Sequence, residues 1–106
     1  MALHSKTILV VDDDELVLAL LEADLRQAGF AVLTAANGKE ALAMVLREPV
    51  DIIVSDVTMP EMDGLEFCQL IRQSPEHVEI PFIFLSAHGG AGERIRGLRS
   101  GADEYI

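Results

Sequence analysis

Short apolar runs that alternate with amphipathic segments constrain the fold of this chain more than any other feature. The runs are rich in β-branched residues and cover residues 6–11, 30–36, 51–55 and 81–86, with a fifth beginning at 104–106. Helical patterns separate them at residues 15–27, 37–47, from 63 onward and at 92–100. Strands alternating with helices of ~10–15 residues predict right-handed βαβ units and a parallel sheet covered by helices on both faces.

The helical segments carry local start and stop signals. Asn37 and Asp63 are residue types that cap helix N-termini, whereas Gly29 and Pro49 are types that follow helix ends. The apolar stripe of the first helix is predicted to consist of Val17, Leu20, Leu21 and Leu25.

Composition excludes several classes of protein. At 106 residues and 50% hydrophobic content the chain predicts one domain with a core, and no apolar run approaches the ~18 residues of a membrane span. Cys68 is the only cysteine, so no internal disulfide can form; we expect a buried thiol and a cytoplasmic location. The formal net charge of −10 argues against direct nucleic-acid binding and favours a cation or a basic partner surface.

Polar side chains follow three of the predicted strands. Asp12, Asp13 and Asp14 follow the first, Asp56 the third, and Ser86 ends the fourth. Ligand sites of open α/β sheets lie beyond the carboxyl ends of the strands, so these groups are candidates to converge. Simpler interpretations stay open for each: a solvated helix start for the acidic triplet, a turn for Asp56 and a strand-end hydroxyl for Ser86.

Convergence of Asp12, Asp13 and Asp56 would favour a metal ion. Two unit charges ~4 Å apart repel by about 4 kcal/mol at an effective dielectric constant of ~20, so such a cluster binds protons or a hard cation. Oxygen ligands without a neighbouring His or Cys cluster indicate Mg²⁺. An ionised carboxylate beside the metal can attack phosphorus, and Asp56 on the central strand is best placed to do so.

The chain resembles the receiver domains of two-component response regulators, including the single-domain chemotaxis type. The matching blocks occur in the family's order at residues 8–14, 36–38, 51–56, 59–64, 85–87 and 101–106. The resemblance implies a single receiver domain over residues 1–106. It also implies a flavodoxin-like doubly wound parallel sheet with strand order 2-1-3-4-5.

The resemblance also implies roles for individual residues. Asp56 matches the phosphoacceptor for a sensor histidine kinase or phosphotransfer protein. Asp12 and Asp13 match the Mg²⁺-binding acidic pair, with Asp56 and the backbone carbonyl of Thr58 as further ligands. The phosphoryl group adds charge and acceptor oxygens. Ser86 would respond as the switch hydroxyl and Tyr105 as the switch aromatic. Their response would change an output surface on the fourth helix and fifth strand, and an effector would bind that surface.

One part of the family pattern is missing from the sequence. Receiver domains carry a lysine shortly after the fifth strand's aromatic residue, followed by a fifth helix, and by family spacing that lysine would fall two residues beyond Ile106. Lys6 and Lys39 lie at other positions and do not replace it. We therefore expect the domain to be C-terminally incomplete, with part of one sheet face and of the Leu20/Leu21 helix uncovered, which leaves a homodimer open.

Three functional classes are consistent with these residues. The first is a phospho-accepting signalling module rather than an enzyme, with at most Mg²⁺-dependent self-phosphorylation and self-dephosphorylation. The second is an interaction module of receiver fold that no longer signals by phosphate. The third, a Mg²⁺-dependent phosphohydrolase, would need a second catalytic Asp where Thr58 stands and a substrate-enclosing cap for which 106 residues leave no room.

Overall fold

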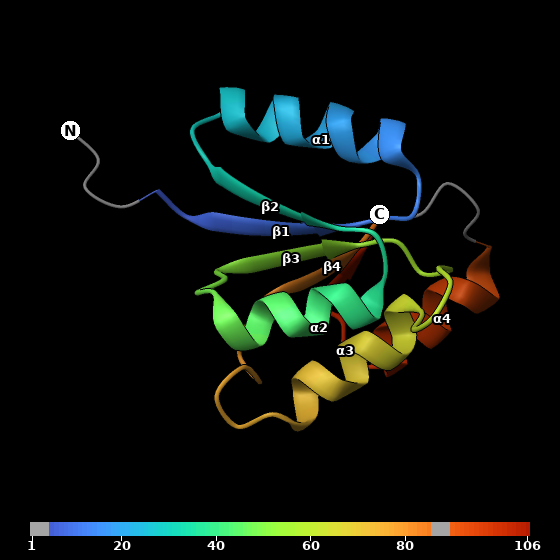
Figure 1. Cartoon of the computed structure of the whole chain (residues 1–106). Helices are drawn as coiled ribbons and strands as arrows, with labels where there is room; N and C mark the ends of the chain where they lie inside the picture. Colours follow the sequence, from blue (N-terminus) through green and yellow to red (C-terminus); the bar gives the residue numbers. More distant parts are fainter. Residues whose placement is uncertain (1–4, 86–89) are drawn as a thin grey trace.

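The structure, a computed structural model, describes residues 5–85 and 90–106. Within these ranges five parallel strands form one sheet in the order β2-β1-β3-β4-β5, which confirms the predicted fold class. The strands are β1 Thr7–Val11, β2 Ala31–Ala35, β3 Ile52–Ser55, β4 Phe82–Phe84 and β5 Glu104–Tyr105. All five run in the same direction, so their carboxyl ends share one edge of the sheet (Figure 1).

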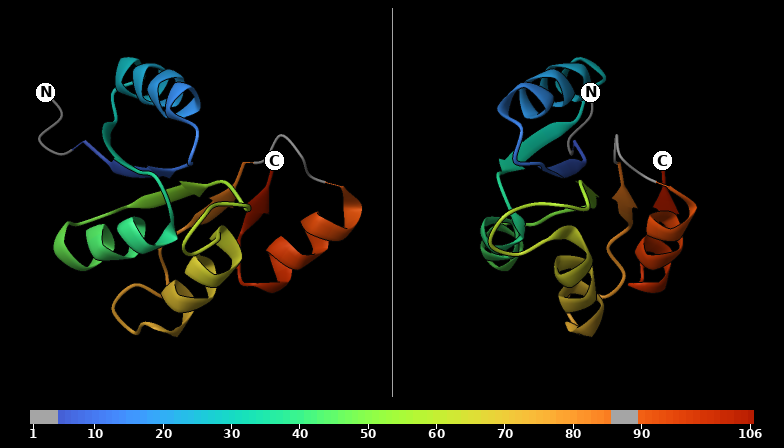
Figure 2. Two further views of the ribbon diagram at one scale, coloured as in Figure 1. Left: turned by 45° about the vertical axis from the view of Figure 1, so that its right-hand side comes forward. Right: turned by 90° about the vertical axis from the view of Figure 1, so that its right-hand side faces the viewer.

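Four helices connect the strands in the described residues: α1 Glu15–Gln27, α2 Gly38–Arg47, α3 Gly64–Gln73 and α4 Ala91–Arg99. Helix α1 lies on one face of the sheet, and α2 and α3 lie on the other (Figure 1). Helix α4 lies beside β5 at the far edge, as both views of Figure 2 show. None of these helices combines the length and apolar character that crossing a membrane requires.

The larger part of the core lies between the sheet and α2 and α3. Leu9, Ile53, Phe67, Phe82 and Phe84 are fully buried there. The Phe82 ring packs at a tilt against Phe67 and Phe84, with ring centroids 5.4 and 5.0 Å apart. Burial of a large apolar side chain contributes about 1.5–3 kcal/mol relative to exposure. This face therefore supplies most of the packing that fixes the sheet.

The α1 face corrects the predicted apolar stripe of the first helix. Leu18, rather than Leu20, packs with Leu21 and Leu25 against the sheet, and Leu20 is 59% exposed. Val54 of β3 is half-buried and packs against the same small core, which is centred on β1 and β2. The observed stripe differs from the predicted one by part of a turn, since six consecutive apolar residues, 16–21, are compatible with more than one buried face.

The predicted caps of α2 and α3 are confirmed. The Asn37 carboxamide oxygen accepts the Glu40 N–H at 2.9 Å, and the Asp63 carboxylate accepts the Glu66 N–H at 2.9 Å. Each cap satisfies an N–H that has no partner within its helix. The caps fix where the loops after β2 and β3 end, and both loops border the acidic edge described next.

Candidate metal centre

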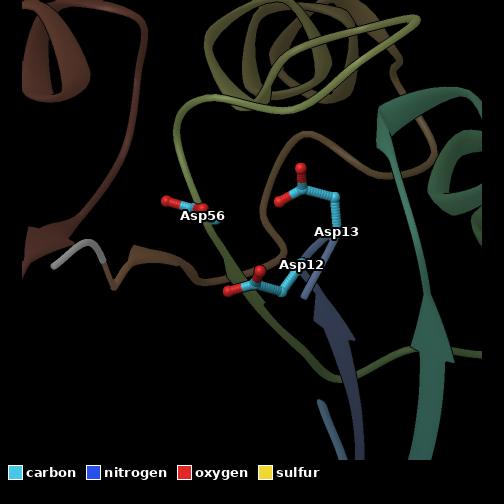
Figure 3. Close-up of side chains that lie close together, drawn as sticks. All are labelled: Asp12, Asp13 and Asp56. Atoms are coloured by element: carbon cyan, nitrogen blue, oxygen red, sulfur yellow. The ribbon is translucent and has the colours of Figure 1, made fainter. Parts of the chain in front are cut away.

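Three carboxylates meet at the carboxyl ends of β1 and β3. One oxygen from each of Asp12, Asp13 and Asp56 lies within 4.8 Å of the others. Figure 3 shows Asp12 and Asp13 at the end of β1, with Asp56 beside them at the end of β3. The Asp56 N–H donates to the Val11 carbonyl at 2.8 Å, which aligns the ends of the two strands. The predicted convergence of these residues is therefore present in the fold.

Asp12 is the most enclosed member of the cluster. Its side chain is only 9% exposed, and its Oδ1 accepts the Asp14 N–H at 2.9 Å. Burial raises the pKa of Asp12 above the ordinary value of 3.8, the Asp14 N–H opposes that rise, and the charges of Asp56, Asp13 and Asp14 add to it. A cation at this edge would offset both the cost of burying the Asp12 charge and the repulsion among the carboxylates.

The other two residues of the acidic triplet, Asp13 and Asp14, have different positions and contacts. Asp13 is exposed and contributes its carboxylate to the cluster. Asp14 instead caps α1, accepting the N–H groups of Leu16 at 2.9 Å and Val17 at 3.3 Å. The triplet therefore provides both a helix cap, through Asp14, and two members of the carboxylate cluster, Asp12 and Asp13.

Asp56 is half-buried and its backbone is held on several sides. The buried Ser55 hydroxyl donates to the Asp56 carbonyl at 2.8 Å, and the Val57 N–H donates to Asp56 Oδ1 at 2.7 Å. A carboxylate oxygen bonded to an adjacent N–H has a restricted orientation. The side chain is thus directed at the edge of the sheet before any ligand binds.

Gly64 is a residue whose importance the sequence did not reveal. Its N–H donates to the Val57 carbonyl at 2.7 Å and closes the loop after β3. A Cβ at this position would overlap the Asp56 carbonyl oxygen and lie 2.8 Å from a Phe84 ring carbon. The start of α3 can therefore approach the Asp56 backbone only because residue 64 is glycine.

The donor set fits Mg²⁺. All three groups supply hard oxygen ligands, and no His or Cys joins them among the described residues. Mg²⁺ in proteins typically uses one or two carboxylates and keeps several waters. Oxygen separations within 4.8 Å suit one ion bound partly through water.

Of the other three predicted site residues, the structure describes Thr58 and Tyr105. Thr58 is exposed in the loop two residues beyond Asp56, and the role of its carbonyl stays a prediction. Ser86 lies outside the described residues. Tyr105 in β5 is buried, at 7% exposure, against Phe84 with ring centroids 6.0 Å apart.

The fold and this edge define a doubly wound α/β domain with an acidic site at the carboxyl ends of its strands. A model of the response regulator receiver domain family matches residues 8–106. The chain belongs to this family of two-component signalling proteins.

Individual relatives agree with this assignment. The chain is 40% identical over 102 residues to the alkaline phosphatase synthesis transcriptional regulatory protein PhoP of Bacillus subtilis, covering 96% of this chain and 42% of PhoP. It spans less than half the length of the curated relatives it matches.

Solved structures give the same result. Chemotaxis protein CheY4 of Vibrio cholerae is 32% identical with a TM-score of 0.91, covering 97% of this chain and 86% of that one. The receiver domain of the sensor histidine kinase PA1611 from Pseudomonas aeruginosa is 30% identical with a TM-score of 0.89, covering 97% and 84%. In that structure a magnesium ion is coordinated in the active-site cleft.

Proposed function

We propose that this chain is a phospho-accepting signalling module in which Asp56 receives a phosphoryl group. The observation that carries the proposal is the cluster of Asp12, Asp13 and Asp56 at the carboxyl edge of the sheet in a receiver-family chain. Asp56 is the proposed acceptor because it extends from the central strand β3 and its backbone is held by Ser55. Asp12, Asp13 and the Thr58 carbonyl are the proposed Mg²⁺ ligands, together with Asp56.

The proposed reaction is a transfer between two proteins. A carboxylate oxygen of Asp56 attacks the phosphorus of a phosphohistidine on a sensor kinase or phosphotransfer protein. The new O–P bond forms as the N–P bond breaks, and the electron pair of that bond stays on the imidazole nitrogen. When bound, Mg²⁺ would offset the negative charge that the phosphoryl oxygens bring to three carboxylates.

The proposed output is a change in the surface of α4 and β5. A phosphoryl group adds about −1.5 to −2 charge and strong acceptor oxygens, which we expect Ser86 to bind through its hydroxyl. Tyr105 would then change its orientation, and an effector domain or protein would read the altered surface. We place the module in the cytoplasm, because its sole cysteine, Cys68, is a buried free thiol.

A phosphodonor assay tests the proposal. The chain is incubated with acetyl phosphate and Mg²⁺, and its mass is measured before and after mild base. We expect one added phosphoryl group that is stable in acid and lost in base, with no adduct in Asp56→Asn or when Mg²⁺ is chelated. An adduct on Asp56→Asn equal to that on wild type would show that the acceptor assignment is wrong. No adduct on either protein would favour an interaction module that does not use phosphate.

A further inference from the structure

Helix α4 presents two residues, one turn apart, to the ring of Tyr105. The Tyr105 hydroxyl donates to Glu93 Oε1 at 3.2 Å. Gly97, four residues later on the same face of the helix, lies against the ring itself. Helix α4 and β5 form a contacting pair at the edge of the sheet (Figure 2).

Gly97 makes room for the aromatic ring. It is buried, and a Cβ there would lie 2.8 Å from a Tyr105 ring carbon and 3.1 Å from a Phe84 ring carbon. Contacts below about 3 Å require a neighbour to move, and Phe84 is itself fully buried in the core. The ring that can yield is therefore Tyr105, at the edge of the sheet.

Glu93 binds the polar end of the same side chain. A buried tyrosine needs a partner for its hydroxyl, and a carboxylate is a stronger acceptor than a neutral group. Glu93 is half-buried, whereas most of α4 is exposed. Ring and hydroxyl are thus accommodated by one helix face.

We infer that Glu93 and Gly97 form a cradle that holds Tyr105 in its buried orientation and so sets how readily the tyrosine can move. The regulatory part of this inference rests on the proposed function, since Tyr105 is the proposed switch aromatic. Glu93 is a positioning residue: it acts through Tyr105 and has no contact with Asp56 among the described interactions. Removal of the carboxylate should weaken the hold on the Tyr105 side chain without altering the acidic cluster.

The chain carries its own probe for this inference. Tyr105 is the only tyrosine and there is no tryptophan, so intrinsic emission excited above the phenylalanine band reports this ring. Quenching by acrylamide measures its accessibility. In Glu93→Ala we expect the population of accessible Tyr105 to rise about fivefold, which corresponds to about 1 kcal/mol and to the worth of one hydrogen bond.

Three further variants serve as controls and as a second test for the quenching of Glu93→Ala. Glu93→Gln keeps an acceptor oxygen and should retain most of the protection. Glu104→Ala removes an exposed carboxylate next to Tyr105 in the sequence and should quench like wild type. Gly97→Ala should expose the ring even with Glu93 present. Equal quenching of Glu93→Ala and wild type would overturn the inference.

A double-mutant cycle of unfolding free energies tests the inference even if a variant folds poorly. Glu93→Ala should cost less unfolding free energy in a Tyr105→Phe background than in wild type; equal costs would overturn the inference. These measurements need neither Mg²⁺ nor a phosphodonor, so they are independent of phosphorylation at Asp56. With acetyl phosphate and Mg²⁺ added, the change in Tyr105 quenching should differ between wild type and Glu93→Ala, and identical changes would refute the regulatory part.

Discussion

The acidic cluster should lower the stability of the metal-free protein, and Asp12→Asn tests this directly. Asparagine has nearly the shape of aspartate, and its carboxamide oxygen can still accept the Asp14 N–H that Asp12 accepts at 2.9 Å. The substitution therefore removes one charge and leaves the local packing and hydrogen bonding largely in place. Any large change in stability then reports electrostatics and not lost contacts.

The magnitude follows from the geometry. Cluster oxygens lie within 4.8 Å of one another, and at that distance two charges repel by about 3.5 kcal/mol at a dielectric constant of ~20 and about 0.9 kcal/mol at ~80. Asp13 is exposed, so its repulsion with Asp12 lies near the lower value, whereas Asp56 is half-buried. We expect Asp12→Asn to stabilise the metal-free protein by about 1–2 kcal/mol and to raise its Tm by about 5–15 °C.

Mg²⁺ should reverse the order of the two proteins. A ligand that binds only the folded state stabilises it by RT ln(1 + [L]/Kd), about 1.4 kcal/mol at ten times Kd. Wild type should gain this stabilisation and Asp12→Asn should lose most of it, because a proposed charged ligand is replaced by a neutral amide. Thermal melting over a Mg²⁺ titration, starting from EDTA, measures both quantities in one series.

Asp24→Asn is the matched control for this experiment. Asp24 is an exposed carboxylate on α1, so its loss changes the net charge equally and should alter stability by only about 0.5 kcal/mol. Its response to Mg²⁺ should equal that of wild type. If Asp12→Asn melted at or below the wild-type temperature in EDTA, or kept the full Mg²⁺ response, the electrostatic reasoning would be refuted.

The protonation of Asp12, the close approach at Gly64 and the hydrogen bonds of Arg72 can each be tested in turn. The pKa of Asp12 is raised above 3.8, so the folded chain holds this proton more tightly than the unfolded chain; that stabilisation is present below pH 3.8 and is lost as the pH rises through the raised pKa. Mg²⁺ affinity should rise over the same interval, and calorimetry in buffers of different ionisation enthalpy should detect proton release. In urea unfolding, Gly64→Ala should destabilise the fold by about 2–4 kcal/mol, and calorimetry should show weaker Mg²⁺ binding. Gly92→Ala has open space at its Cβ and should change neither stability nor Mg²⁺ binding. Arg72→Lys should cost about 2 kcal/mol in the same assay, because the guanidinium donates to the carbonyls of Gly101, Val78 and Ile80 and to Asp103, while exposed Arg47→Lys should have little effect.

The parts of the site that the sequence predicts depend on strand ends. The carboxyl ends of parallel strands share one edge, so Asp12, Asp13 and Asp56 could be brought together from strand assignments alone. Helix caps are equally local, since Asn37 and Asp63 bond N–H groups three residues away. Neither inference needs the packing of distant side chains.

The parts that the sequence does not predict depend on packing between elements. The requirement for Gly64 arises from the Asp56 carbonyl oxygen, just after β3, and from the Phe84 ring of β4. The Glu93 bond to Tyr105 joins α4 to β5, and nothing in the spacing of these residues selects Glu93 over other polar residues of the helix. The choice of Leu18 over Leu20 likewise depends on how α1 is rotated about its own axis when it packs against the sheet.

Separate parts of the molecule account for stability and for the site. The positions of the acidic residues are fixed by backbone bonds, from Asp12 N–H to the Ala35 carbonyl at 3.1 Å and from Asp56 N–H to the Val11 carbonyl at 2.8 Å. These bonds belong to the sheet, and the apolar core around Phe67 and Phe82 packs against one face of that sheet. Because that core holds the strands in register, the carboxylates can stay close despite their repulsion. The unfavourable energy retained at the edge is what a cation would relieve on binding, so the features that weaken the metal-free fold are the same ones that favour Mg²⁺.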